Sequence, residues 1–164
     1  MLGIAQDLLA QANHLATYQA LGPTQCDLRR AVSTAYYALF HLLVEDTGQR
    51  WQGGTKASEA GLQRALDHGP MRQVSMQFST PNWTDWRGSV NVVPLQLRRV
   101  AGTFADLQED RHIADYNNQE PWTNTEVQEI LIGVALAFQD WHSIRTDPMA
   151  GNYLLAMLIG KRRQ

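Results

Sequence analysis

The feature that most constrains the fold is an apolar stripe that runs without interruption through residues 28–43. Its members recur every three or four residues, which places them on one face of an α-helix and not on alternating faces of a strand. Thr24 with Asp27 forms a capping-box-like pair at the start of this helix, and Gly48 is expected to end it. A long helix with one apolar face needs other helices to cover it, so the chain is predicted to form an all-α bundle. The members of the stripe are Leu28, Ala31, Val32, Ala35, Tyr36, Leu39, Phe40 and Leu43.

The same spacing predicts helices on both sides of this segment. Apolar residues recur at helical intervals before Gly22-Pro23, after Pro94 and again before Trp141, whereas alternation typical of strands is almost absent. We therefore expect an antiparallel bundle of about five to six helices, in one domain spanning residues 1–164. Besides the helix after Thr24, the expected helices cover residues 4–19, 58–68, 94–116 and 125–146, and a short segment after Asp147-Pro148. A Thr125–Gln128 capping box is expected to open the helix over 125–146. Whether the helix over 58–68 resumes after Gly69-Pro70 and continues to Phe78 is left open.

Two segments are predicted to be loops. Gln49–Thr55 is polar and rich in glycine and glutamine. Ser79–Val92 contains a proline, a glycine and two tryptophans, Trp83 and Trp86, whose indoles we expect to pack on the helices. Long loops in compact domains often serve a function, so the second segment is of interest.

Composition narrows the classes of function. The net charge of −2 gives no overall attraction to nucleic acid or to membranes, and short basic pairs such as Arg29-Arg30 are expected to be solvated. The single cysteine, Cys26, excludes an internal disulfide and is expected to fill a small space in the core. No metal-binding or phosphate-loop motif is present, so we expect no metal and no cofactor. The longest apolar run, 130–138, is too short to cross a bilayer, and with no signal-peptide pattern the expected location is the cytoplasm.

The segment 111–116, Arg-His-Ile-Ala-Asp-Tyr, is the strongest candidate for a site. Arg111 continues the buried stripe of the preceding helix, at a position where an aliphatic residue is expected. Burying an unpaired guanidinium is costly, so Arg111 should pair with Asp115 one turn later, just as Tyr116 follows His112 by one turn. Two interpretations remain open, an ion pair that stabilises the helix end and a polar active cluster. The nearby carboxylates Asp106, Glu109 and Asp110 are expected to be merely solvated.

Two segments carry a resemblance to a known family. The sequence RRAVSTAYYALFH, from Arg29 to His41, resembles the signature helix of the HEPN superfamily, and Arg111–Tyr116 resembles its later motif helix. The two segments cover 19 of the 164 residues of the chain. Arg111 matches the arginine of the family's motif and His112 matches the polar residue after it. The motif histidine, four to six positions further on, is replaced here by Tyr116, Asn117 or Asn118.

The resemblance implies a function and partners. HEPN proteins are helical bundles that usually dimerise, and many are metal-independent endoribonucleases of toxin–antitoxin and phage-defence systems. A homodimer is therefore expected, with RNA as the substrate and with an antitoxin or a nucleotidyltransferase as a further partner. Because the motif histidine is missing, whether the chain is an enzyme stays open. The alternative is a non-catalytic HEPN dimer that binds a nucleotide, a nucleic acid or a partner protein.

Roles for individual residues follow from RNA chemistry. Arg111 would hold the phosphate, because its planar fork matches phosphate oxygens. His112 would act as base or acid, with Tyr116 holding it or donating a proton, and Asp115 would orient Arg111. Arg30, Tyr37 and His41 lie on one flank of the second helix and are the candidate substrate-binding residues; pairing of Tyr37 with His41 is the plainer interpretation.

Overall fold

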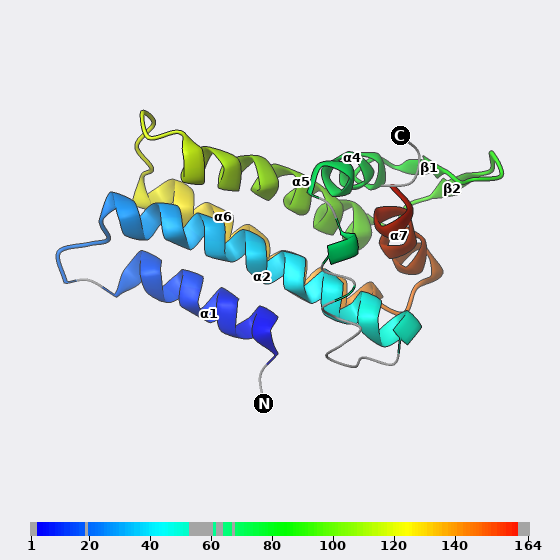
Figure 1. Cartoon of the computed structure of the whole chain (residues 1–164), viewed down its shortest axis with the longest axis horizontal. Coiled ribbons are helices and arrows are strands. Elements are labelled where there is room, and N and C mark those ends of the chain that lie inside the picture. The colour runs from blue at the N-terminus through cyan, green and yellow to red at the C-terminus, as the bar shows by residue number, and fades with distance from the viewer. Residues whose placement is uncertain (1–2, 19, 53–60, 62–63, 67, 161–164) are drawn as a thin grey trace.

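The chain forms a helical bundle with one small sheet, which confirms the predicted all-α class. The computed structural model describes residues 3–18, 20–52, 61, 64–66 and 68–160. The longest helix among the described residues is α2, and the hairpin of β1 and β2 extends from the end of the bundle beside α4 and α7 (Figure 1). In chain order, the described elements are α1 (Ile4–Thr17), α2 (Gln25–Gln52), α4 (His68–Phe78), β1 (Asn82–Thr84), β2 (Val90–Val92), α5 (Leu95–Tyr116), α6 (Asn124–Ile144) and α7 (Pro148–Ile159).

The core is built around α2. All eight members of its predicted stripe are buried, and Ala38, Leu42 and Val44 on other faces are buried as well. The reason is visible in the arrangement, because α1, α5 and α6 pack along different sides of α2 (Figure 1). Helix α2 thus occupies the centre of the bundle, and the flank toward α5 becomes part of the candidate site.

Helices α5 and α6 bury the stripes that the sequence predicts for them. In α5, Leu97, Val100, Phe104 and Leu107 are all buried. In α6, Leu131 and Trp141 are buried, whereas Ile130 is only partly so because it lines a hollow between the two helices. The two helices run side by side, so the end of α5 and the start of α6 lie at the same end of the molecule (Figure 1).

Several predicted helix boundaries shift. The expected end at Gly48 is wrong, because α2 continues to Gln52. The last turns of α2 bond to the residue after α6: the guanidinium of Arg145 donates to the Gln49 side chain at 2.9 Å, and Arg50 donates to the Arg145 carbonyl. The predicted loop 49–55 is therefore helical over its first four residues, and 53–55 lie outside the described residues. The capping box Thr24–Asp27 is present, with the Asp27 carboxylate accepting from the Thr24 amide at 2.9 Å.

The capping box of α6 lies two residues earlier than predicted. Thr123 accepts from the Glu126 amide, and Glu126 accepts from the Thr123 amide, so the Thr125–Gln128 pair does not cap this helix. Helix α4 begins at His68 and runs through Gly69-Pro70, since proline is tolerated in a first turn. The earlier helix predicted over 58–68 falls largely outside the described residues.

The segment Ser79–Val92, predicted as a loop, contains an antiparallel hairpin of β1 and β2. Trp83 pairs with Asn91 in its register, and Gly88 takes a positive φ of 84° in the connecting turn. Trp83 is buried against Phe78, with ring centroids 4.7 Å apart, as expected for a packed indole. Trp86 only partly follows the prediction, because it contacts Trp83 edge-on and stays 42% exposed.

Two further predictions concern single residues. Asp147 caps α7 by accepting from the Met149 amide, with Pro148 in the first turn, as predicted. Cys26 is exposed in the first turn of α2, so its predicted place in the core is wrong. Within the described part of the chain, none of the helices has the length and hydropathy needed to cross a bilayer.

Candidate functional site

Arg111 occupies a partly buried position at the end of α5, as its place in the stripe predicts. Its side chain is 16% exposed, and its Nε donates to the Asp115 carboxylate at 3.1 Å. The hydroxyl of Ser33 on α2 donates to the same carboxylate oxygen at 3.4 Å. The ion pair is therefore formed, and Asp115 joins α5 to α2 through Ser33.

Two tyrosines of α2 lie against the Arg111 guanidinium. Its central carbon is 5.3 Å from the ring centroid of Tyr36 and 5.6 Å from that of Tyr37, within the range of cation–π attraction. Burial raises the pKa of Tyr36, while the charge of Arg111 opposes that rise. Tyr36 thus stays protonated, and the two rings hold the guanidinium in one orientation.

The outer edge of the guanidinium remains open. The Asp115 carboxylate occupies Nε, while the two terminal nitrogens form no hydrogen bond with the described residues. A planar guanidinium with free terminal N–H groups can bind two oxygens of one phosphate or carboxylate. The geometry therefore suits the capture of an anion by Arg111 without loss of the Asp115 contact.

Arg29, in the second turn of α2, holds the end of α5 in place. Its Nη1 donates to the carbonyls of Ala114 at 3.0 Å and Asn117 at 2.8 Å, with a longer contact to Ile113 at 3.5 Å. Its Nη2 donates to the Glu120 carbonyl at 2.6 Å. The last turn of α5 has no basic residue of its own, so Arg29 supplies the donors that these terminal carbonyls need. Arg29 was predicted to be solvated, and that prediction is wrong.

His112 and Tyr116 form a separate pair on the surface. Their ring centroids are 5.0 Å apart, His112 is exposed, and Tyr116 is 68% exposed. His112 lies about 100° around the helix axis from Arg111, as successive helical residues must. Within one chain, the imidazole is thus turned toward Tyr116 and not toward the open edge of the Arg111 guanidinium.

The predicted substrate-binding residues lie on one flank of α2, but only one contacts Arg111. Tyr37 does so through its ring. Arg30 is exposed one turn before Ser33, and partly buried His41 packs edge-on against Phe40 at 5.5 Å between centroids. Arg30 and His41 thus flank the site along the helix without contacting its arginine. Ser33 lies on the same flank and bonds to Asp115, a contact that the sequence analysis did not predict.

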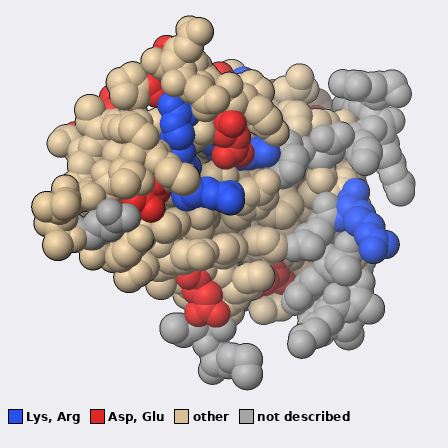
Figure 2. Space-filling view, turned by 60° about the vertical axis from the view of Figure 1, so that its left-hand side comes forward, with Lys and Arg blue, Asp and Glu red and all other residues tan. Residues whose placement is uncertain are grey.

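Charges of both signs are mixed at this end of the molecule. In the view that brings the α1–α2 and α5–α6 connections forward, basic and acidic side chains lie next to each other near the middle of the face (Figure 2). The described residues form no broad basic patch on this face. Extended contact with the backbone of a nucleic-acid duplex requires such a patch, so the face suits recognition of one or two anionic groups.

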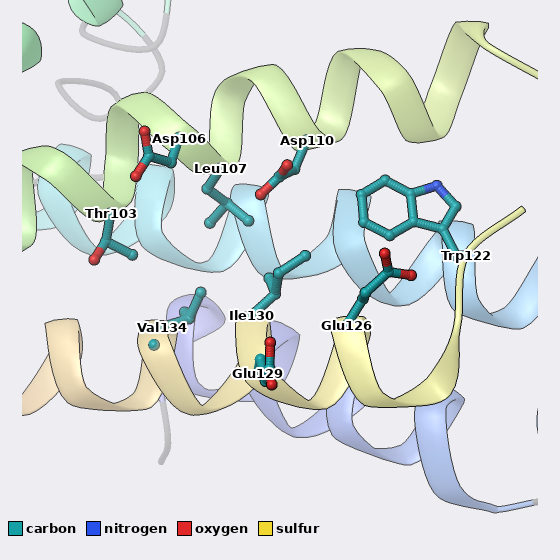
Figure 3. A pocket seen from close by; sticks show the side chains of 10 residues that line it. Thr103, Asp106, Leu107, Asp110, Trp122, Glu126, Glu129, Ile130 and Val134 are labelled. Carbon is teal, nitrogen blue, oxygen red and sulfur yellow. The ribbon is translucent and has the colours of Figure 1, made fainter. Parts of the chain in front are cut away.

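A hollow of about 400 Å³ lies between α5 and α6. Asp106 and Asp110 line it from α5, Glu126 and Glu129 line it from α6, and the Trp122 indole closes one end (Figure 3). Among the described residues, no three acidic, histidine or cysteine side chains come together closely enough to hold a metal ion. The four carboxylates that line the hollow would repel phosphate, so the hollow is not a second site for the anion.

Asp110 is not simply solvated, contrary to prediction. It is partly buried in the wall of the hollow, and burial together with the charges of Asp106 and Glu109 raises its pKa to about 6. The folded state therefore binds the proton more tightly than the unfolded state, whose carboxyl keeps its ordinary pKa. It follows that the free energy of unfolding falls as pH rises from about 4 to about 6, and that the full penalty is present above that window.

We expect Asp110→Asn to raise the free energy of unfolding above pH 6 by ~1 kcal/mol. This figure discounts the shift for the partial exposure of the carboxyl. The melting temperature should rise by about 3 °C at neutral pH and stay unchanged below about pH 3, where the carboxyl is protonated in both states. Thermal unfolding at the two pH values measures this. Glu129→Gln, on the facing wall, is the matched control and should leave the melting temperature unchanged; equal gains in both variants would contradict the account.

Comparison with known proteins adds no assignment, because no family model, no curated protein and no solved structure matches the chain.

Proposed function

We propose that the chain is an RNA-directed protein of HEPN type that binds a phosphate of single-stranded RNA at Arg111. The observation that carries the proposal is the state of this guanidinium: Asp115 and the rings of Tyr36 and Tyr37 fix it, and its two terminal nitrogens bond to none of the described residues. Such a preorganised fork loses little freedom when it binds a phosphate. The resemblance of Arg29–His41 and Arg111–Tyr116 to HEPN segments supports RNA as the source of that phosphate.

Single strands suit the surface better than duplexes do. Tyr116 is exposed beside His112, and exposed aromatic rings stack on unpaired bases. The mixed charges around the site leave few phosphate contacts to be made (Figure 2). The proposal therefore places one phosphate on Arg111 and a neighbouring base on Tyr116.

The experiment that tests the proposal is a titration of a fluorescent single-stranded RNA with the wild-type chain at several salt concentrations. We expect saturable binding with a shallow salt dependence. Each phosphate contact to a single strand contributes a slope of about −0.7 in log K against log salt, so one or two contacts give a total between about −0.7 and −1.4. A steep slope would indicate a broad basic surface, and an absence of binding would contradict the proposal.

Cleavage of the bound RNA is a second candidate function, favoured by the exposed His112 next to Arg111. A general base must approach the 2′-hydroxyl to within about 3 Å, and here the imidazole lies against Tyr116. Catalysis would thus require a second copy of the chain to bring the groups together. Incubation of labelled RNA with the wild type and with His112→Ala separates the two functions. We expect intact RNA with both, and cleavage by the wild type alone would establish the nuclease.

The proposed assembly is a homodimer, with an antitoxin or a nucleotidyltransferase as a further partner in a toxin–antitoxin or phage-defence system. The resemblance carries this part of the proposal, and closed two-fold dimers are the commonest oligomers. Light scattering at micromolar protein should return twice the chain mass of 18.5 kDa. A single species of one chain mass would contradict the dimer without affecting the Arg111 site.

A further inference from the structure

A cavity of about 270 Å³ lies at the other end of the molecule, among α4, α7 and the hairpin. These elements lie side by side there, remote from the end of α5 that carries Arg111 (Figure 1). Buried Val74 and Ala156 provide an apolar floor, and Trp83 and Trp86 provide aromatic walls. Ligand pockets for drug-sized molecules begin at about 300 Å³, so this cavity has room for one small ring system.

Two uncharged side-chain amides line the cavity. Gln73 and Gln77 follow each other by one turn on α4, and neither amide forms a hydrogen bond with the described residues. The indole of Trp83 is only 6% exposed, and its N–H forms no hydrogen bond with the described residues. It is therefore a further donor that a ligand in the cavity can use.

Asp85 is the one carboxylate among the residues that line the cavity, and it already accepts hydrogen bonds from the hairpin. Asp85 accepts from the amides of Arg87 and Ser89 at 2.9 Å each, and Asn91 donates to its other oxygen at 3.4 Å. These bonds, together with Gly88 at positive φ, fix the hairpin turn that carries Trp86. The carboxylate therefore supports the shape of the cavity and leaves its interior without a free charge.

We propose that this cavity binds a nucleobase. Two kinds of lining side chain indicate this class of ligand. The indoles can stack on a flat ring, and the glutamine amides can offer both donors and acceptors to the edge of that ring. The pairing of glutamine amides with base edges is a common mode of direct recognition. The exposed side of Trp86 marks the entrance, through which the sugar of a nucleoside would remain in solvent.

The test is calorimetric titration of the full chain with the four ribonucleosides and, separately, with methyl glucoside. We expect at least one nucleoside to bind with a Kd below about 1 mM and the glucoside to bind not at all. Trp86→Ala and Gln73→Ala/Gln77→Ala should each weaken nucleoside binding about tenfold or more, as loss of a base–aromatic stack does. The matched controls are Trp51→Ala, which removes an indole of nearly equal exposure (43%) from α2, and Gln11→Ala on α1; both should bind as the wild type does.

Three outcomes would overturn the inference. They are an absence of nucleoside binding, binding that the cavity variants leave unchanged, and binding of the glucoside as tight as that of every nucleoside, which would make the cavity a sugar site. The result is independent of the proposed function, because Arg111→Ala leaves the cavity intact. Nucleoside binding that survives Arg111→Ala supports the cavity even if RNA does not bind at Arg111.

Discussion

Replacement of Arg111 by alanine is expected to lower the affinity for single-stranded RNA at least tenfold. The change removes both N–H groups that would contact the phosphate, and hydrogen bonds to charged groups are worth about 1.5–3 kcal/mol. The cost to folding should be smaller than for a fully buried pair, at ~1–2 kcal/mol. The reason is that Asp115 keeps partial exposure and the Ser33 hydroxyl after Arg111 is removed.

Two companion variants separate the roles of Arg111. Arg111→Lys keeps the charge but loses the fork, so RNA affinity should fall nearly as far as in the alanine variant. Asp115→Asn leaves the guanidinium in place over Tyr36 and Tyr37, so affinity should change by less than about threefold while the ion pair is lost. RNA anisotropy and thermal unfolding of the same preparations measure both effects. Lysine binding as well as arginine would show that the site needs only a positive charge.

Arg29→Ala is expected to cause the largest loss of stability, about 3 kcal/mol. The change leaves the carbonyls of Ala114, Asn117 and Glu120 without their donor at the end of α5. Loss of a charged donor costs about 1.5–3 kcal/mol, and several acceptors are involved here. The melting temperature should fall by about 6–12 °C.

The neighbouring Arg30→Ala is the matched control for Arg29. Arg30 is exposed one position along α2, so its removal should change the melting temperature by less than about 2 °C. Arg29→Lys should recover only part of the loss, because an ammonium cannot reach carbonyls spread over seven positions with a fixed fork. Equal melting temperatures for Arg29→Ala and Arg30→Ala would refute the role of Arg29.

The sequence predicts the helices well because burial follows their periodicity. The stripe from Leu28 to Leu43 is buried throughout, and Arg111 continues the stripe of α5 and pairs with Asp115 as its spacing requires. Boundaries are harder to predict, because contacts from distant elements decide them. Helix α2 passes Gly48 since Gln49 and Arg50 bond to Arg145, almost a hundred residues away.

The contacts of Arg29 with the end of α5 could not be predicted from the local sequence pattern. The adjacent Arg29 and Arg30 look alike in sequence, and only the packing of α2 against α5 distinguishes them. One signal was present in the sequence. Helix α5 ends at Tyr116, its C-cap is Asn117 instead of glycine, and its last turn has no basic residue, so its terminal carbonyls need a donor from elsewhere. Asp110 is a similar case, since its partial burial depends on the neighbouring α6 and on Trp122 (Figure 3).

The most direct measurement of the central claim is a titration of the protein's arginine Nε–H resonances with a short single-stranded RNA, observed by NMR. The account predicts that the Arg111 resonance shifts and saturates with the RNA, that the Ser33 and Asp115 amides shift with it, and that the amides of Asp106 and Glu129 around the acidic hollow do not. Binding that shifts other resonances while Arg111 stays unchanged would contradict the account.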